Sequence, residues 1–276
     1  MRVGLSMWSL EKEAFAGKLS TVEFIRFAGT LGLDGVEVLD CFWRDEAREV
    51  PEVRAAAAAE GLAIAAYAIG NDFVTADTGE RAAQLAGVKH GVDVACELGT
   101  GILRVFSGNA KDDLPFATAR NWIREGLAEA AAYAEQRGVT LALENHGLFA
   151  GRSAQVIDLI EEIDSPALRA TADTANFLLV GEEPHAAVAA LKGKIAHVHL
   201  KDFRKVGPDH QGPSFASTGP ERYTGTVVGE GEVRFDLILR SLREAGFTGF
   251  LSLEYEGTGD PRAGVERSLA KLKAML

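Results

Sequence analysis

Eight strand-like runs alternate with eight helical patterns along the 276-residue chain, and this alternation limits the possible folds more than any other feature. The strand-like runs lie at 2–8, 35–40, 63–70, 102–108, 140–147, 168–174, 195–202 and 250–257. The helical patterns lie at 20–32, 51–61, 80–99, 116–138, 153–163, 184–193, 235–246 and 261–276. Such alternation is typical of a parallel sheet covered by helices. Eight complete units predict an α/β protein with one domain over residues 1–276, a single (β/α)8 TIM barrel.

The competing α/β arrangement is an open, doubly wound sheet. Such a sheet normally carries a glycine-rich phosphate-binding turn after its first strand, and the segment SMWSLEKEAF that follows the first run here contains no glycine. Several helical patterns also end at a glycine directly before the next strand, as at Gly61, Gly99, Gly138 and Gly246. We therefore expect the closed barrel and no nucleotide cofactor.

Charge and cysteine content narrow the class of partner. The chain has 40 Asp and Glu against 29 Lys and Arg, a formal net charge of -11, so it has no overall basic field to attract nucleic acid. Only Cys41 and Cys96 are present, which suits a reducing compartment. The sequence begins with RVGLSMWSL, without the pattern of a signal peptide or a membrane span. We expect a cytoplasmic protein that acts on a small molecule, with neither nucleic acid nor membrane as partner.

The longest segment that looks irregular runs from about 203 to 232, after the seventh strand. It is rich in Gly, Pro, Ser and Thr. A long loop at this position lies on the rim where barrels carry their chemistry. Two interpretations stay open, a lid over a substrate and a mobile surface excursion.

Four residues with metal-binding side chains lie near the ends of the last four strand-like runs: Glu144, Asp173, His199 and Glu254. Because successive strand residues point to opposite faces, the apolar neighbours Leu141 and Leu143 should face the helices while these four point into the barrel. Crowded carboxylates repel one another unless a cation neutralises them. Ordinary hydrogen bonds to loop amides would explain any one of them. The set of four predicts one divalent ion, with manganese preferred and magnesium, cobalt or zinc also compatible.

Five segments in the second half carry a family resemblance: LENHG, TADTANF, HVHLKD, VGEGEVRF and FLSLEYEG. In this order and at these separations they resemble the xylose-isomerase-like barrel family of sugar and sugar-phosphate isomerases and epimerases. The resemblance implies that Glu144, Asp173, His199 and Glu254 bind the ion, and that Glu144 and Glu254 also act as acid and base on a ketose through an enediolate. It further implies a homodimer or homotetramer.

Departures from the family pattern leave other reactions open. Ketose epimerases of the family usually show Asp-x-x-His after the sixth strand, whereas Asn176 stands here at the histidine position. The arginine expected after the strand-seven ligand has only Arg204 and Lys205 as approximate counterparts. A metal-dependent dehydratase or lyase acting on a keto-sugar or keto-inositol is the main alternative. An abasic-site endonuclease is a remote one, since it needs more histidines and a less acidic surface.

Further polar or aromatic residues at the same strand ends are candidate substrate contacts: Trp8, Glu37, Arg104, His146, Asn176 and Lys201. Each has a structural alternative. A buried charge at Glu37 or Arg104 needs a partner, so each is either a substrate contact or half of an internal ion pair. Lys201 is expected to hold a substrate oxygen or to pair with Glu254 or Glu256. His197 is interpreted as a buried, hydrogen-bonding histidine.

Overall fold

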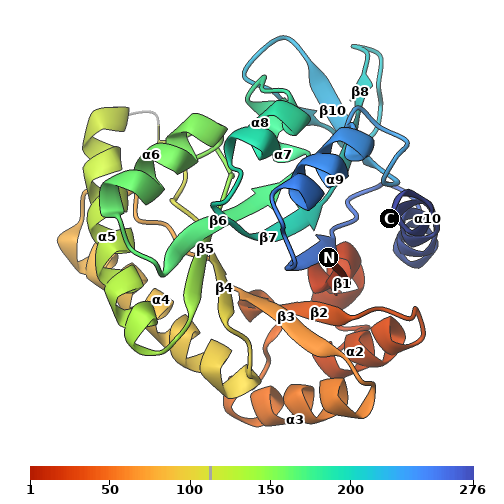
Figure 1. Ribbon diagram of the computed structural model, residues 1–276, viewed down its shortest axis with the longest axis horizontal. Helices are drawn as coiled ribbons and strands as arrows, with labels where there is room; N and C mark the ends of the chain where they lie inside the picture. The colour runs from red at the N-terminus through yellow and green to blue at the C-terminus, as the bar shows by residue number, and fades with distance from the viewer. Residues whose placement is uncertain (112–113) are drawn as a thin grey trace.

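The computed structural model describes residues 1–111 and 114–276 and consists of a closed barrel of eight parallel strands inside a ring of helices (Figure 1). The strand order around the barrel is β1, β11, β7, β6, β5, β4, β3, β2. The barrel strands are β1 (Arg2–Ser6), β2 (Gly35–Leu39), β3 (Ala63–Ala68), β4 (Ile102–Val105), β5 (Thr140–Glu144), β6 (Leu168–Asp173), β7 (Ile195–Leu200) and β11 (Phe250–Leu253). The first and last of these pair directly, so the predicted (β/α)8 TIM barrel is confirmed.

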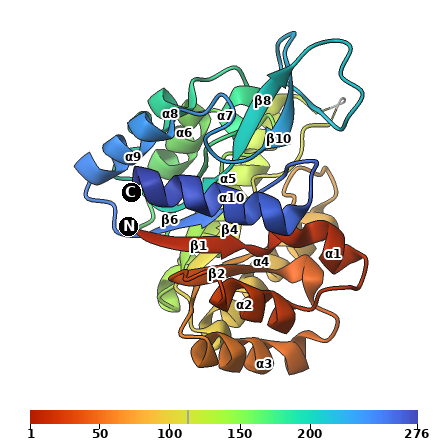
Figure 2. The same ribbon diagram turned by 90° about the vertical axis from the view of Figure 1, so that its right-hand side faces the viewer.

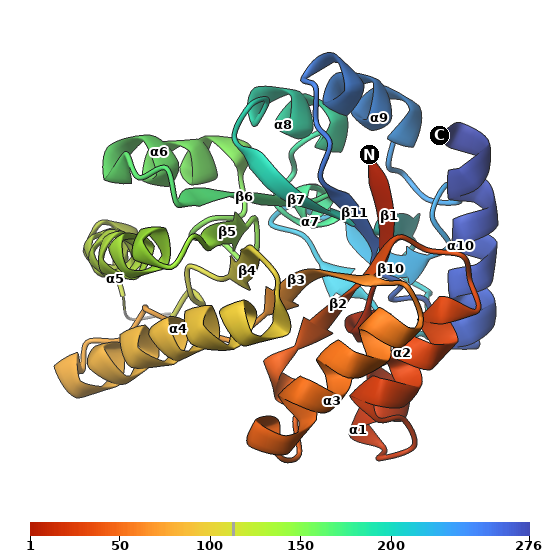
Figure 3. The same ribbon diagram turned by 60° about the horizontal axis from the view of Figure 1, so that its bottom comes forward.

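Helices surround the strands, as the view along the barrel shows (Figure 3). They are α2 (Thr21–Gly29), α3 (Glu46–Ala59), α4 (Thr78–Leu98), α5 (Phe116–Gln136), α6 (Ser153–Ile163), α8 (Pro184–Ala190), α9 (Phe235–Glu244) and α10 (Pro261–Met275). Local sequence sets their ends. Ser20 and Glu23 form a capping box at the start of α2, and Gly99 ends α4 with a φ of 80°, a conformation that favours glycine.

Shorter elements lie where strands give way to helices. These are the 3-10 helices η1 (Met7–Leu10) and η2 (Asp40–Phe42) and the short helices α1 (Glu11–Phe15) and α7 (Asn176–Leu179). Figure 2 shows α1 at the end of the barrel to which β1 points, opposite the two chain ends. No helix in the described part of the chain is both long enough and apolar enough to cross a membrane.

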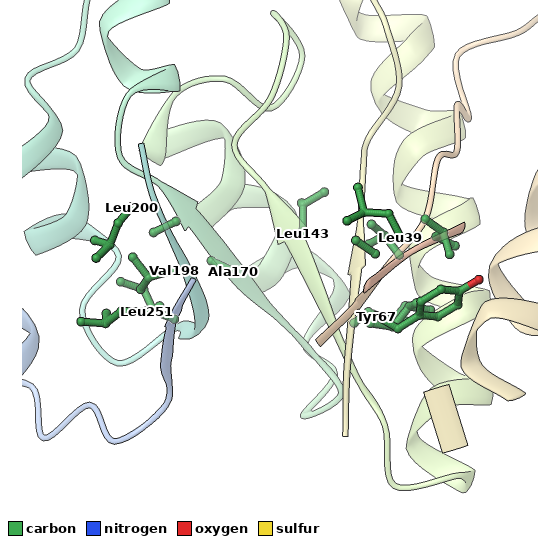
Figure 4. Close-up of a cluster of buried hydrophobic side chains, with 14 of the residues drawn as sticks. Leu39, Tyr67, Leu143, Ala170, Val198, Leu200 and Leu251 are labelled. Atoms are coloured by element: carbon green, nitrogen blue, oxygen red, sulfur yellow. The ribbon is translucent and has the colours of Figure 1, made fainter. Parts of the chain in front are cut away.

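The main core lies between the strands and the helices. Outward-facing strand residues such as Leu143, Val198, Leu200 and Leu251 are buried there, and Figure 4 shows them among residues from several strands. The alternate residues of the same strands point into the barrel, where polar side chains gather. The two-residue period of the strands therefore separates a packed outer layer from a polar interior.

The segment 203–232 is more regular than its composition predicts. It contains most of a three-stranded antiparallel sheet, formed by β8 (Asp202–Val206), β9 (Phe215–Ala216) and β10 (Arg222–Thr226) in the order β8, β10, β9. The expectation of an irregular loop was wrong because the pairing joins runs about 20 residues apart, across the Gly- and Pro-rich stretch. In Figures 1 and 2 this sheet projects from one side of the barrel.

Candidate active site and metal centre

The four predicted ligand residues lie at one end of the barrel interior. Glu144 ends β5, Asp173 ends β6, His199 is the penultimate residue of β7, and Glu254 directly follows β11. All four are buried. This is the carboxyl end of a parallel barrel, where active sites of this fold occur.

Three carboxylates converge on one imidazole nitrogen. The distances from His199 Nδ1 are 2.9 Å to Glu254 Oε2, 3.5 Å to Glu144 Oε2 and 3.8 Å to Asp173 Oδ2. Ligand atoms of Glu144, Asp173 and His199 all lie within 4.8 Å of one another. His199 Nδ1 and Asp173 Oδ2 are buried without a hydrogen-bond partner of acceptable geometry. Three oxygen donors and one imidazole at these distances fit a divalent ion.

Glu37 is the partner of two histidines. Its Oε2 lies 2.8 Å from His197 Nε2 and 3.0 Å from His199 Nε2. Of the two predicted roles for Glu37, the structure shows the internal partner, although its carboxylate also borders the cavity described below. Histidines that bind metals commonly use their other nitrogen in this way, which directs His199 Nδ1 toward the three carboxylates.

Charge around His199 outweighs its burial. Burial lowers the pKa of His199, but Glu37, Glu254 and Glu144 together raise that pKa well above its ordinary value. The surrounding carboxylates therefore favour a positive charge at this position. A divalent ion would supply that charge in place of a proton.

Lys201, which directly follows β7, reaches two of these carboxylates and that of Glu256. Its Nζ lies 2.8 Å from Asp173 Oδ2, 3.3 Å from Glu254 Oε1 and 3.4 Å from Glu256 Oε1. Both of the predicted ion pairs are present, and the contact with Asp173 is an additional one. The lysine is buried and also faces the cavity.

The two glutamates proposed to transfer protons differ in their surroundings. Burial raises the pKa of Glu144 to about 7, although His199 and Arg104 act against the rise. Burial also raises the pKa of Glu254, but Lys201 and His199 outweigh it and bring the value to about 2. Arg104 Nε lies 3.3 Å from Glu144 Oε2, so Arg104 forms the internal ion pair that was one of its two predicted roles.

A cavity of about 350 Å³ opens over these residues. Among the predicted substrate contacts, Trp8, Glu37, Arg104, His146 and Lys201 line it, together with Glu144 and Glu254. Trp8 Nε1 donates a 2.9 Å hydrogen bond to Glu256, and the His146 ring lies 4.6 Å from the Phe106 ring. Asn176 is not part of the wall. Its Nδ2 donates to Glu144 Oε1 at 3.1 Å, so it helps to hold that carboxylate.

Several wall residues had not been predicted: Ser6, Phe15, Leu39, Asp40, Cys41 and Gly70. Asp40 and Cys41 come directly after β2, so their place after a strand end was the available signal. Phe15 lies nine residues beyond β1, at the end of α1, and its side chain folds back against Trp8 at a ring distance of 6.1 Å. The contact between Phe15 and Trp8 depends on tertiary packing, so no local sequence pattern indicates it.

Arg204 and Lys205 lie on β8 with exposed side chains and do not line this cavity. Lys205 pairs instead with Glu221, at 3.3 Å. A second cavity, of about 410 Å³, opens at the other end of the barrel, bordered by Arg169, Lys192 and Phe247. It contains none of the carboxylates discussed above, so we place the chemistry at the carboxyl end of the strands.

Residues 25–275 match the model of a protein family described as the xylose isomerase-like TIM barrel. The chain belongs to this family. The resemblance carried by the five sequence segments is thereby confirmed.

Curated relatives include inosose dehydratases. The chain is 26% identical over 170 residues to the enzyme of Lacticaseibacillus casei. The aligned region covers 60% of this chain and 57% of the relative. It is 27% identical over 147 residues to the enzyme of Bacillus thuringiensis (strain Al Hakam). Here the aligned region covers 51% of this chain and 49% of the relative. The chain thus spans about half the length of the curated relatives it matches.

Solved structures with the same fold include enzymes of two reaction types. An L-ribulose 3-epimerase superposes with a TM-score of 0.76 at 20% identity, over 100% of this chain and 94% of that one. A probable 3-DHS dehydratase of petrobactin synthesis from Bacillus anthracis gives 0.78 at 19% identity, over 99% of both chains. At this identity the likeness concerns the fold alone.

Proposed function

We propose that this protein is a metal-dependent enzyme that transfers a proton at the carbon next to the carbonyl of a small keto-sugar or keto-polyol. The observation that carries the proposal is the convergence of Glu144, Asp173 and Glu254 on His199 Nδ1, next to a cavity that Glu144 and Glu254 line. Manganese is the expected ion. When bound, it would polarise the substrate carbonyl and stabilise negative charge on the carbonyl oxygen.

The chain's own residues supply the proton transfer. Glu144 and Glu254 both border the cavity, so each can reach a substrate carbon from a fixed position. Arg104 and Asn176 hold Glu144 from behind, and Lys201 holds Glu254. Held carboxylates need little reorganisation when the proton moves, which favours transfer. Return of the proton to the opposite face gives an epimer, and return to the neighbouring carbon gives an isomer.

Charge in the cavity favours an uncharged substrate. The cations that line it, Arg104 and Lys201, are already paired with carboxylates, and the wall also carries Glu37, Asp40 and Glu256. A phosphate group needs a free cation or a row of backbone N–H donors. We therefore favour unphosphorylated sugars and cyclic polyols over sugar phosphates.

Dehydration is the second candidate, and the inosose dehydratases among the relatives favour it. Loss of hydroxide from the carbon beyond the deprotonated one would use the same first step. The departing hydroxyl needs a proton, and Glu144, whose pKa burial raises to about 7, borders the cavity and can supply it. The abasic-site endonuclease is not favoured, because the net charge of -11 opposes DNA binding.

Proton exchange tests the proposal and separates the two reactions. The manganese-loaded protein would be incubated in deuterium oxide with a panel of neutral ketoses and keto-inositols, and products followed by NMR. Deuterium at the carbon next to the carbonyl with inversion supports an epimerase. Loss of water with a new enone absorbance supports a dehydratase. Absence of exchange across the panel, or nicking of abasic DNA, would refute the proposal.

A further inference from the structure

The ammonium of Lys201 contacts two of the four residues proposed to hold the metal. Its Nζ is 2.8 Å from Asp173 Oδ2 and 3.3 Å from Glu254 Oε1, and its side chain is only 5% exposed. Arg104, which lines the same cavity, contacts Glu144 alone among these ligands. Lys201 therefore contacts two carboxylates, those of Asp173 and Glu254, to which a divalent ion would also bind.

This contact solves a charge problem in the metal-free protein. Asp173 and Glu254 are buried, and a buried carboxylate without a nearby cation is costly. The same holds for a buried ammonium without an anion. Each group therefore stabilises the other, and the barrel can fold before any ion arrives.

The same contact opposes metal binding. A divalent ion and an ammonium draw on the same oxygens, and they repel each other at such short range. Glu256 gives the ammonium another partner, because it lies 3.4 Å from Nζ and is held in place by Trp8 Nε1. Glu256 is not one of the proposed ligands, so it can keep Lys201 paired when the ion takes the other two.

We propose that Lys201 is an internal counter-ion of the metal site, which stabilises the metal-free protein and lowers its affinity for the divalent ion. The inference rests on the proposed function, since it requires that Asp173 and Glu254 bind an ion. As a consequence, the bound ion would exchange with ions in solution instead of being held permanently.

Calorimetric titration of chelator-treated protein with Mn²⁺ tests this inference. Lys201→Met should bind Mn²⁺ about tenfold more tightly than the wild type, and its metal-free form should unfold at a lower temperature. Lys201→Gln, which keeps a hydrogen-bond donor without the charge, should show the same gain in affinity. Lys205→Met is the matched control, because that lysine pairs with Glu221 on the exposed sheet and should change neither quantity.

A double-mutant cycle guards against a variant that folds poorly. Glu256→Gln removes the alternative partner of the ammonium, so it should weaken Mn²⁺ binding more in the wild type than in the Lys201→Gln background. Equal effects in both backgrounds, or unchanged affinity in Lys201→Met and Lys201→Gln, would overturn the role of Lys201 while leaving the metal site intact. If none of these proteins binds Mn²⁺, both the inference and the proposed metal dependence fail.

Discussion

His199 is the residue on which the candidate site depends, because both of its ring nitrogens are engaged. Nε2 faces Glu37, and Nδ1 faces the carboxylates of Glu254, Glu144 and Asp173. The ring cannot rotate without losing contacts on both sides. A carboxylate behind a metal-binding histidine fixes its orientation and tautomer, and we propose that Glu37 positions His199 in this way.

Glu37→Gln should therefore weaken Mn²⁺ binding by about tenfold. A glutamine cannot accept hydrogen bonds with both of its terminal atoms, and it carries no charge to match the histidines. The measurement is calorimetric titration of metal-free protein. Glu49→Gln is the control and should leave the affinity unchanged, because this buried glutamate lies in the first turn of α3 and accepts hydrogen bonds from the backbone of Arg44 and Asp45. Equal affinities for Glu37→Gln and the wild type would contradict the positioning role.

Glu254→Gln tests the proposal that Glu254 transfers a proton to or from the substrate. The variant should lose at least about a hundredfold in the rate of proton exchange, because general acid–base catalysis contributes on that order or more. The shape of the side chain is preserved, so circular dichroism should show a folded barrel. Full activity in this variant would remove Glu254 from the mechanism.

At the level of elements, Asp202 holds the segment after β7 in place. It lies next to Lys201, and its carboxylate accepts backbone hydrogen bonds from Gly229 at 2.9 Å, Gly231 at 2.8 Å and Val233 at 3.2 Å. The three-stranded sheet thus leaves the barrel at Asp202 and returns to the same residue. A second contact joins Gly225 of β10 to Gly257 beyond β11.

The contribution of these Asp202 hydrogen bonds to stability should depend on pH. Burial raises the pKa of Asp202 from 3.8 to about 6, so the folded protein binds more protons than the unfolded chain between these values. The contribution of Asp202 to the free energy of unfolding should then decrease by roughly 2 kcal/mol as the pH rises from about 4 to 7.

Urea unfolding of Asp202→Asn and of the wild type at several pH values measures this contribution. The difference in unfolding free energy between the two proteins should shrink as the pH rises, since asparagine does not titrate. Asp209→Asn, at an exposed aspartate of the same segment, should show no such change. A difference between Asp202→Asn and the wild type that is constant with pH would refute the role of its titration.

The sequence was informative where the alternation along a strand determined which side chains point into the barrel. Glu144, Asp173, His199 and Glu254 follow from alternation along four strands, because that alternation decides which side chains enter the barrel. Sequence reasoning did less well with partners. Whether Lys201 contacts a substrate or Asp173 depends on the distance between side chains at the ends of β6 and β7, and the sequence of neither strand gives that distance alone. The sheet of β8, β9 and β10 was missed for a similar reason, since its pairing joins distant runs.

For the molecule as a whole, the metal should stabilise the fold without being required for it. An ion present at about a hundred times its dissociation constant adds roughly 3 kcal/mol, which corresponds to several degrees in the unfolding temperature of a chain of this size. Differential scanning calorimetry with Mn²⁺ and with a chelator measures the shift. Unfolding on chelation at 25 °C would contradict the counter-ion role of Lys201, and identical curves would contradict metal binding.

The assembly of the whole protein stays an expectation of the family resemblance. A homodimer or homotetramer would raise the unfolding temperature with protein concentration. Light scattering during size-exclusion chromatography gives the mass directly. A mass of one 29.4 kDa chain would refute the expectation.

The pairing of β1 with β11 has a consequence for the order in which the protein matures. Arg2 lies beside Phe250, so one seam of the barrel joins residues almost 250 positions apart. During synthesis β5, β6 and β7 leave the ribosome well before β11, and the nascent chain then presents Glu144, Asp173 and His199 without Glu254. Such long-range contacts form slowly. Under the proposed function, binding of the ion by all four residues therefore follows translation, once the seam has closed, and a chaperone that delays closure would also delay metal binding.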